Sequence, residues 1–299
     1  MLVKQELKVE MEIRRGAMST VSTSPQQSFE SPVEQQLSEL LIAVRTKKPL
    51  VHNITNYLAM NISANALLAL GASPIMAHSR EEASELCRIS QALVINIRTL
   101  SSGWAEAMVD TAMTARAHNI PWVLDPDGAD ISSYRMDTCQ ELAGLSPKVI
   151  RGNLKEIAAL CADCEPELTP AQMAKADLDQ LLPAILSCAS RRSSVLCISG
   201  LTDNIHLVTD GERVLKVANG DALSSQVAAM GCTASALVGA FLTVTDDAWL
   251  ATAAAIALLG VACELAASQA KGPGSFQAEL MDQLYLIQSD QLAARLRLL

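Results

Sequence analysis

Residues 227–242, VAAMGCTASALVGAFL, contain the strongest structural and chemical signal in the chain. A turn ending at Gly231-Cys232 leads directly into an uncharged run of small and aliphatic residues, which predicts a buried helix. The first turn of a helix leaves backbone N–H groups unpaired and carries partial positive charge, so such an end attracts phosphate. Glycine also precedes many ordinary core helices, and that alternative stays open for this segment taken alone.

Around this segment, short apolar strands alternate with helical patterns. Strands are predicted at residues 50–52, 74–76, 93–97, 122–124, 148–150 and 194–198, and helices at 33–45, 60–70, 80–91, 103–118 and 171–186. The Asp210-Gly211 pair predicts a hairpin between 206–209 and 213–217. Such alternation predicts an α/β fold with a mostly parallel central sheet and helices on both faces.

The composition narrows the class of protein. The chain has 299 residues, of which 50% are hydrophobic and 3% aromatic, so aliphatic side chains fill a sizeable core. A net charge of −9 without a long basic run argues against a nucleic-acid partner. The uncharged run at 251–263 is short and bracketed by acidic residues, so we expect a buried helix rather than a membrane span. No secretory leader is apparent, and we expect a cytoplasmic protein.

Two further features concern organisation and thiols. Residues 1–32 are charged and then rich in Ser, Thr, Gln and Pro, which predicts a disordered N-terminal extension before a single domain at 33–299. The eight cysteines lie mostly in apolar segments and indicate reduced thiols rather than a disulfide framework. Cys161 and Cys164 form a lone CxxC, for which a zinc site is the less favoured interpretation.

In parallel sheets, ligands bind beyond the carboxyl ends of the strands. Polar or functional residues follow most of the predicted strands here: Asn53, Asn56, Met76, Ala77, Asn96, Arg98, Asp125, Arg151, Asn153 and Ser199. The chain contains neither GxGxxG nor GxxxxGK[ST], so a dinucleotide fold and a P-loop are not indicated.

These positions suit phosphoryl transfer, which needs a nucleotide site, a metal and an aligned acceptor hydroxyl. Gly231 and Cys232 are the expected anion hole, and Arg151 can pair with nucleotide phosphate. Asp125 and Glu156 can hold Mg²⁺ through water. Structural roles remain open as alternatives: Asp125 could instead cap a turn, and Arg151 and Glu156 could instead form an exposed ion pair.

Several blocks, in content and order, resemble hydroxyethylthiazole kinases. They are VHNITNYLAMNISANALLALGASPIMAH, ALVINIRTLS, VLDPDGAD, VIRGNLKEIAAL, NGDALSSQVAAMGC and KGPGSF, between Lys48 and Phe276. The resemblance implies a ribokinase-like fold, commonly a homotrimer with sites at subunit interfaces. It also implies Mg²⁺ and ATP-dependent phosphorylation of the alcohol of 4-methyl-5-(2-hydroxyethyl)thiazole in thiamine salvage.

The resemblance also assigns residues. Met76 resembles the thiazole-contacting methionine of the family, and Asn56 and Ala229 are expected in the same substrate pocket. Arg151 resembles the ATP-contacting arginine, and Ser199 stands where the family usually has a nucleotide-contacting threonine.

Cys232 occupies the position of the catalytic aspartate of many ribokinase-like relatives, although cysteine there is usual for thiazole kinases. A helix N-terminus would lower the pKa of its thiol. We therefore expect Cys232 chiefly to position the substrate, with base catalysis as the alternative.

Several departures from the family pattern fall inside the expected site. Arg98 stands where glycine is usual, and Asp127 replaces a valine and Asp130 a glycine. Arg98 and Asp127 are expected on neighbouring strand-end loops, where they can pair. In the turn before Cys232, Ala228 and Ala229 stand in place of a threonine and a glycine, and Met230 stands in place of a small residue. If the lost glycine requires positive φ, Ala229 is strained by about 1–2 kcal/mol, and Met230 can crowd the phosphate.

Two alternatives to a thiazole kinase follow from these departures. One is a kinase-like protein with weak or no turnover that binds a small ligand or stabilises a partner. The other is a kinase of a different vitamin-precursor alcohol, such as a hydroxymethylpyrimidine or a pyridoxal-like compound.

Overall fold

The computed structural model describes residues 32–162, 177–201 and 204–299. Residues Val33–Leu299 form one compact unit. The predicted N-terminal extension, apart from Pro32, lies outside the described residues, as do Cys164 and the first part of the helix predicted at 171–186.

A single eight-stranded sheet organises this unit, in the order β2-β1-β3-β4-β5-β6-β7-β8. Its strands are β1 (Leu50–Ile54), β2 (Ser73–Met76), β3 (Ala92–Asn96), β4 (Trp122–Asp125), β5 (Val149–Asn153), β6 (Val195–Ser199), β7 (His206–Thr209) and β8 (Val214–Val217). Strands β1 to β6 are parallel, whereas β7 and β8 pair antiparallel as the predicted hairpin. The predicted mostly parallel sheet is therefore confirmed.

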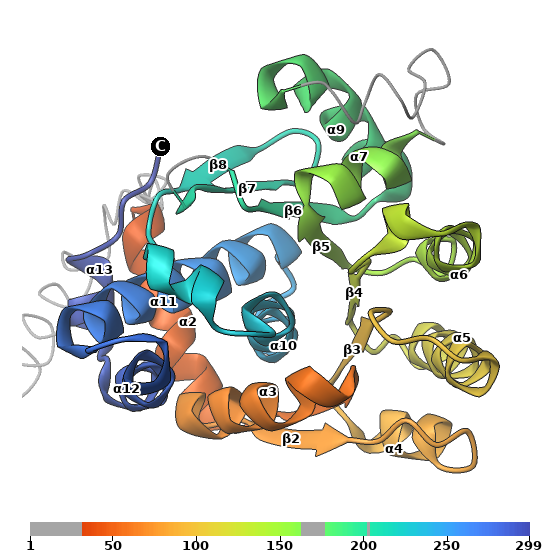
Figure 1. Ribbon diagram of the computed structural model, residues 1–299, viewed down its shortest axis with the longest axis horizontal. Coiled ribbons are helices and arrows are strands. Elements are labelled where there is room, and N and C mark those ends of the chain that lie inside the picture. The colour runs from red at the N-terminus through yellow and green to blue at the C-terminus, as the bar shows by residue number, and fades with distance from the viewer. Residues whose placement is uncertain (1–31, 163–176, 202–203) are drawn as a thin grey trace, which may run out of the picture. The chain divides into compact units, whose positions relative to one another are not determined.

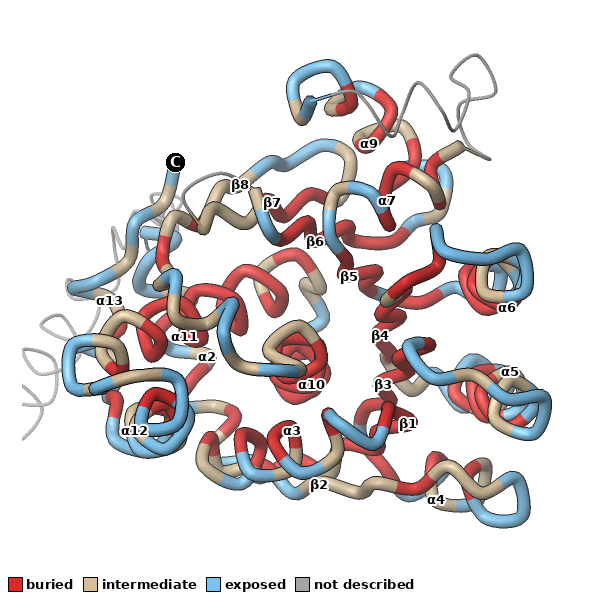
Figure 2. The backbone as a smooth tube through the Cα atoms, in the orientation of Figure 1, coloured by how far each residue is buried: buried red, intermediate tan, exposed pale blue. Residues whose placement is uncertain are grey.

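Helices cover both faces of the sheet (Figure 1). One face carries α4 (Ala83–Ile89), α5 (Ser102–Ala117), α6 (Ser133–Ala143), α7 (Leu154–Cys161) and α9 (Leu178–Arg192), and the other α2 (Val33–Lys47), α3 (Tyr57–Leu70), α10 (Met230–Phe241), α11 (Ala248–Gln269), α12 (Pro273–Leu286) and α13 (Ser289–Ala293). Alternate strand side chains enter the two cores, so that Val94 faces α10 and Ile95 faces α5. Figure 2 shows the central strands and the inner helix surfaces buried, the edge strands β2 and β8 mostly intermediate, and the outer helix surfaces exposed.

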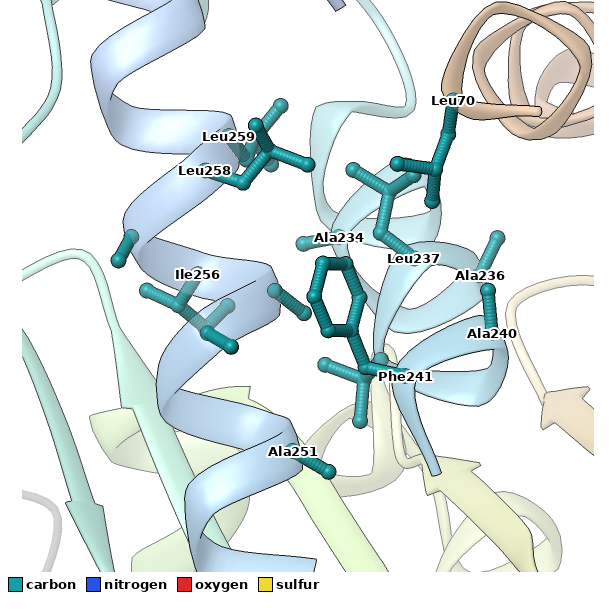
Figure 3. Close-up of a cluster of buried hydrophobic side chains, with 14 of the residues drawn as sticks. Leu70, Ala234, Ala236, Leu237, Ala240, Phe241, Ala251, Ile256, Leu258 and Leu259 are labelled. Carbon is teal, nitrogen blue, oxygen red and sulfur yellow. The ribbon is translucent and has the colours of Figure 1, made fainter. Parts of the chain in front are cut away.

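Helix α10 packs unusually close to the sheet because its residues are small. A Cβ atom at Gly239 would lie 2.6 Å from Val94 Cγ2 and 3.2 Å from Val51 Cγ1, so this position has no room for a side chain. Figure 3 shows the Phe241 ring of α10 between this helix and α11, and Leu237 of α10 beside Leu70 of α3. Every residue from Cys232 to Phe241 is buried, which fixes the direction of the helix and the place of its N-terminus.

Helix α11 is the expected apolar core helix. By length and composition it could cross a membrane, but 78% of its most apolar window is buried inside the unit. It packs against α10 and α12 within one apolar cluster, which agrees with the interpretation of residues 251–263 as a buried helix.

The strand register brings the predicted polar residues to one edge of the sheet. Asn53 pairs with Met76, Asn96 with Asp125, and Asn153 with Ser199. The carboxyl ends of six parallel strands are thus level, from Met76 on β2 and Asn53 on β1 to Asn153 on β5 and Ser199 on β6.

Candidate active site

The N-terminus of α10 lies over this edge and has no capping side chain. Residue Ala229 occupies the N-cap position with φ 64° and ψ 17°, in the left-handed region, and its methyl group can accept no hydrogen bond. Helices α4 and α12 also begin without a capping side chain, whereas α3, α5, α6, α7, α9 and α11 each begin at a side chain that caps the helix. The first-turn N–H groups of α10 are therefore available to an anion. The suspected positive φ at Ala229 is confirmed.

Cys232 lies in this first turn, where its sulfur faces the ends of β1 and β3. The side-chain amides of Asn56 and Asn96 donate to its Sγ at 3.3 and 3.4 Å, and Asn56 also donates to Asn96 Oδ1 at 3.0 Å. Burial and the charges of Asp125 and Asp127 raise the pKa of the thiol to about 12. The expected lowering by the helix dipole is therefore wrong, because desolvation and two nearby carboxylates outweigh it.

Asp125 ends β4 directly beneath α10 and is almost completely buried. Ser235, one turn after Cys232, donates to Asp125 Oδ2 at 2.9 Å. Burial raises the pKa of Asp125 to about 6, despite the opposing charge of Arg151. The carboxylate thus joins β4 to α10, and the alternative that it merely caps a turn is wrong.

Glu156 lies in the first turn of α7 and is also buried. Its Oε1 accepts from Gly128 N at 2.9 Å and its Oε2 from Asn153 N at 2.8 Å, while Asn153 caps the helix in return. Burial raises the pKa of this carboxyl. The alternative of an exposed ion pair with Arg151 is wrong, since both side chains are buried.

Arg151 lies on β5, on the other side of Asp125. Its Nη2 donates to Ser199 Oγ at 2.8 Å, and Ser199 Oγ donates to Gly152 O at 3.3 Å. A Cβ atom at Gly231 would lie 2.7 Å from Arg151 Nη1, so only glycine lets the guanidinium approach the start of α10 so closely. Arginine, serine and the helix N-terminus therefore converge on one point.

A cavity of about 220 Å³ opens beside this point. Arg151, Ser199, Met230 and Gly231 line it together with residues of α11. Met230 packs against the core of the unit and forms part of the wall while the cavity stays open. A larger cavity of about 490 Å³ lies at the opposite edge of the sheet, beside Pro121 at the start of β4, and is lined by none of the predicted site residues.

On the other side of Cys232, Asn56 caps α3 and Met76 ends the edge strand β2. Met76 is partly exposed, whereas Asn56 is fully buried. The neighbouring His52 hydrogen-bonds Ala77 O at 2.8 Å, and burial lowers its pKa. This histidine is neutral at physiological pH and belongs to the core.

The predicted pair of Arg98 and Asp127 is confirmed. The Arg98 Nη1 group donates to both carboxylate oxygens of Asp127, at 3.1 and 3.0 Å. Asp127 Oδ2 in turn lies 4.0 Å from Cys232 Sγ. These residues follow β3 and β4, so the pair lies across the middle of the sheet edge.

Several residues near the site were missed in the sequence. The cavity beside Arg151 and Ser199 is also lined by Asn204, His206, Gly220, Ser224, Ser225, Ala234, Ile256, Leu259, Gly260 and Cys263. The α11 residues give no local signal, since that helix is apolar on all sides. A detectable signal existed for Ser235, which follows Cys232 by three residues and so shares its helix face.

A second missed feature is an aromatic cluster that includes His78, two residues after Met76. The ring of His78 lies 4.3 Å from Trp104 and 6.2 Å from Tyr57, between ring centres. The three residues come from three segments of the chain that only the fold brings together.

The metal interpretation stands on carboxylates alone. Among the described residues, no group of three or more His, Cys, Asp or Glu side chains is arranged to hold a metal ion. Water-mediated contacts from Asp125 and Glu156 are the arrangement that remains compatible with this geometry. The zinc interpretation of the CxxC involves Cys164, which lies outside the described residues.

The comparisons with known proteins concern the family and the fold. Residues 41–290 match the model of the hydroxyethylthiazole kinase family. The chain is 43% identical over 261 residues to a hydroxyethylthiazole kinase of Syntrophus aciditrophicus, covering 86% of this chain and 94% of that relative. The structure of a hydroxyethylthiazole kinase protein from Pyrococcus horikoshii superposes with a TM-score of 0.80 at 38% identity, covering 88% of this chain and 98% of that one.

A more distant comparison concerns the fold alone. A ribokinase-like superfamily protein from Enterococcus faecalis superposes with a TM-score of 0.53 at 12% identity, covering 84% of this chain and 81% of that one.

Proposed function

Because the chain belongs to the hydroxyethylthiazole kinase family, we propose that it transfers the γ-phosphoryl group of ATP to the alcohol of 4-methyl-5-(2-hydroxyethyl)thiazole, in thiamine salvage. The observation that carries this proposal is the uncapped N-terminus of α10, which lies between an amide-rich side at Asn56 and an arginine-lined cavity at Arg151. An enzyme that joins an alcohol to a phosphoryl group needs an anion site between two such binding regions.

In this proposal Arg151 and Ser199 bind the nucleotide. Their hydrogen bond orients the guanidinium of Arg151 towards Gly231, so its N–H donors are in place before ATP binds. The free N–H groups of Gly231 and Cys232 stabilise the negative charge that develops on the transferred group.

Asn56, Met76 and Ala229 form the acceptor side. The amide of Asn56 is fixed by Asn96 and Cys232, which orients its polar edge at the start of α10. Cys232 positions the acceptor and does not take its proton, because a thiol with a pKa near 12 stays protonated at neutral pH.

We assign Mg²⁺ to the carboxylates of Asp125 and Glu156, held through water. The two groups fit such an ion because Asp127 adds negative charge near both carboxyl groups. A bound dication would supply charge neutralisation for the nucleotide phosphates. Hydrogen bonds already made by both carboxyl groups favour contact through water over direct coordination.

We further propose a cytoplasmic homotrimer. The surface that supports an assembly is the uncharged helix α3, on which Tyr57, Leu58 and Leu68 are each more than half exposed. Such apolar exposure on one helix is typical of a covered surface. Sedimentation velocity tests the trimer: a monomeric sedimentation coefficient at micromolar protein contradicts it.

The activity is tested with purified full-length chain, Mg²⁺ and ATP, against the thiazole alcohol, a hydroxymethylpyrimidine and pyridoxal. We expect ADP formation and a phosphorylated product with the thiazole alcohol in preference to the other two. Binding of the thiazole alcohol without ADP release would instead identify a kinase-like binding protein. Preference for another alcohol would reassign the substrate.

A further inference from the structure

Arg98 and Asp127 lie where the two halves of the proposed site meet. In the strand order, β2 and β1 carry the acceptor-side residues, and β5 and β6 carry the nucleotide-side residues. Arg98 follows β3 and Asp127 follows β4, the two strands between these halves. Phosphoryl transfer between the halves therefore takes place next to this pair.

Arg98 is anchored from both its backbone and its side chain. Its backbone N–H donates to Asn96 Oδ1 at 3.0 Å, and the amide of Asn96 donates to Cys232 Sγ. Its Nη1 contacts both oxygens of Asp127, whose Oδ2 lies 4.0 Å from the same sulfur. Two separate routes thus tie this arginine to the first turn of α10.

The guanidinium still has donors to offer. Arginine carries five N–H groups, and within the described part of the chain Arg98 uses Nη1 alone for side-chain hydrogen bonds. Its side chain is 52% exposed, whereas that of Asp127 is 21% exposed. A half-exposed arginine with free Nε and Nη2 donors suits two-point recognition of a phosphate.

We propose that Arg98 is the acceptor-side cation that binds the γ-phosphoryl group, opposite Arg151 on the nucleotide side. The inference rests on the proposed function. As the alcohol oxygen bonds to the γ-phosphorus, the bond to the bridging oxygen breaks and its electron pair stays on ADP. The hydroxyl proton is released to water. Arg98 then stays with the phosphate ester, and Arg151 stays with ADP.

A rival explanation is that Arg98 only neutralises Asp127. The carboxylate would otherwise add a negative charge beside an incoming phosphate, and removal of Arg98 would weaken nucleotide binding indirectly. The two explanations differ when Asp127 is absent: a direct contact still matters then, and a neutralising one does not.

The test is isothermal titration of the full-length chain with ADP and with the β,γ-methylene analogue of ATP, in the presence of Mg²⁺. For Arg98→Ala we expect affinity for the analogue to fall about 10- to 100-fold, the usual effect of a charged hydrogen bond. Affinity for ADP should stay within about twofold, because ADP lacks the γ-phosphoryl group. Arg98→Lys should recover part of the loss.

A double-mutant cycle separates the two explanations. Arg98→Ala should cost the same factor in an Asp127→Ala background as in the wild-type chain. The matched control is Arg213→Ala, which removes another salt-bridged arginine, in the turn between β7 and β8 at the opposite edge of the sheet. It should change neither affinity.

The proposal is overturned if Arg98→Ala leaves affinity for the analogue unchanged, weakens ADP equally, or has no effect once Asp127 is removed. These affinities are measured by binding alone and do not require the protein to turn over a substrate. Absence of thiazole phosphorylation would therefore refute the proposed function while the role of Arg98 is still measured.

Discussion

Replacing Ala229 with glycine should stabilise the protein, because this alanine holds a backbone conformation that suits glycine. Its φ of 64° and ψ of 17° lie in the left-handed region, which costs an L-residue about 1–2 kcal/mol. Glycine removes that cost but gains freedom in the unfolded chain, which offsets about 0.4–1 kcal/mol. The net expectation is an increase of roughly 0.8 kcal/mol in the free energy of unfolding.

Urea denaturation of the full-length chain measures this change. With an m-value of about 3 kcal/mol/M, the midpoint should rise by roughly 0.3 M at unchanged m. Ala228→Gly is the matched control, since the adjacent Ala228 is not among the residues with positive φ. There the same substitution should lower stability by about 0.5–1 kcal/mol. If both variants lower the midpoint equally, the argument that Ala229 is strained is wrong.

Three further predictions concern the site. Gly231→Ala should raise the KM for ATP about tenfold, because its Cβ would displace Arg151 Nη1 from 2.7 Å; an unchanged KM in initial-rate assays would contradict the close approach. Cys232→Ser should keep kcat within about tenfold, since a protonated thiol and a hydroxyl make similar contacts; a loss above about 100-fold would indicate proton transfer by the thiol. The third concerns pH: burial lowers the pKa of His206 to about 4 in the folded protein. As the pH falls, this histidine is therefore protonated in the unfolded chain before it is protonated in the folded one. The stability that it contributes is complete above about pH 6.5 and is lost as the pH falls towards 4. His206→Gln should make the urea midpoint depend less steeply on pH between 7.5 and 5. An equally steep pH dependence in the variant would assign the effect to other titrating groups.

The sheet was predictable because its strands are short, apolar and separated by clear helical patterns. Each predicted strand overlaps an observed one, and the hairpin at Asp210-Gly211 forms as its turn residues indicate. The ends of elements were less accurate. The strand predicted at 148–150 extends to Asn153, because Arg151 and Gly152 pair with β6 although their side chains give no strand signal.

The composition of the site was predictable at the strand ends and not beyond them. Strand polarity alone places Asn96, Asp125 and Arg151 at one edge. The wall of the cavity beside Arg151 depends on which side of α11 faces the sheet, and an apolar helix carries no pattern that decides this. The pKa of Cys232 was misjudged for a related reason, since the helix dipole is visible in the sequence and desolvation is not.

The carboxylates near Cys232 affect both the ionisation of its thiol and the binding of a phosphate beside it. The placement of Cys232 in the first turn of α10 also puts its sulfur near Asp125 and Asp127. A group so close to two carboxylates resists ionisation, because a thiolate there would add a third negative charge in a buried space. An incoming phosphate meets the same repulsion, which the N–H groups and the two arginines must offset. Phosphate binding and proton removal therefore make opposite electrostatic demands on the residues around Cys232. In the proposed function these residues meet the first demand: they orient and stabilise the transferred group, and the proton of the acceptor alcohol passes to water.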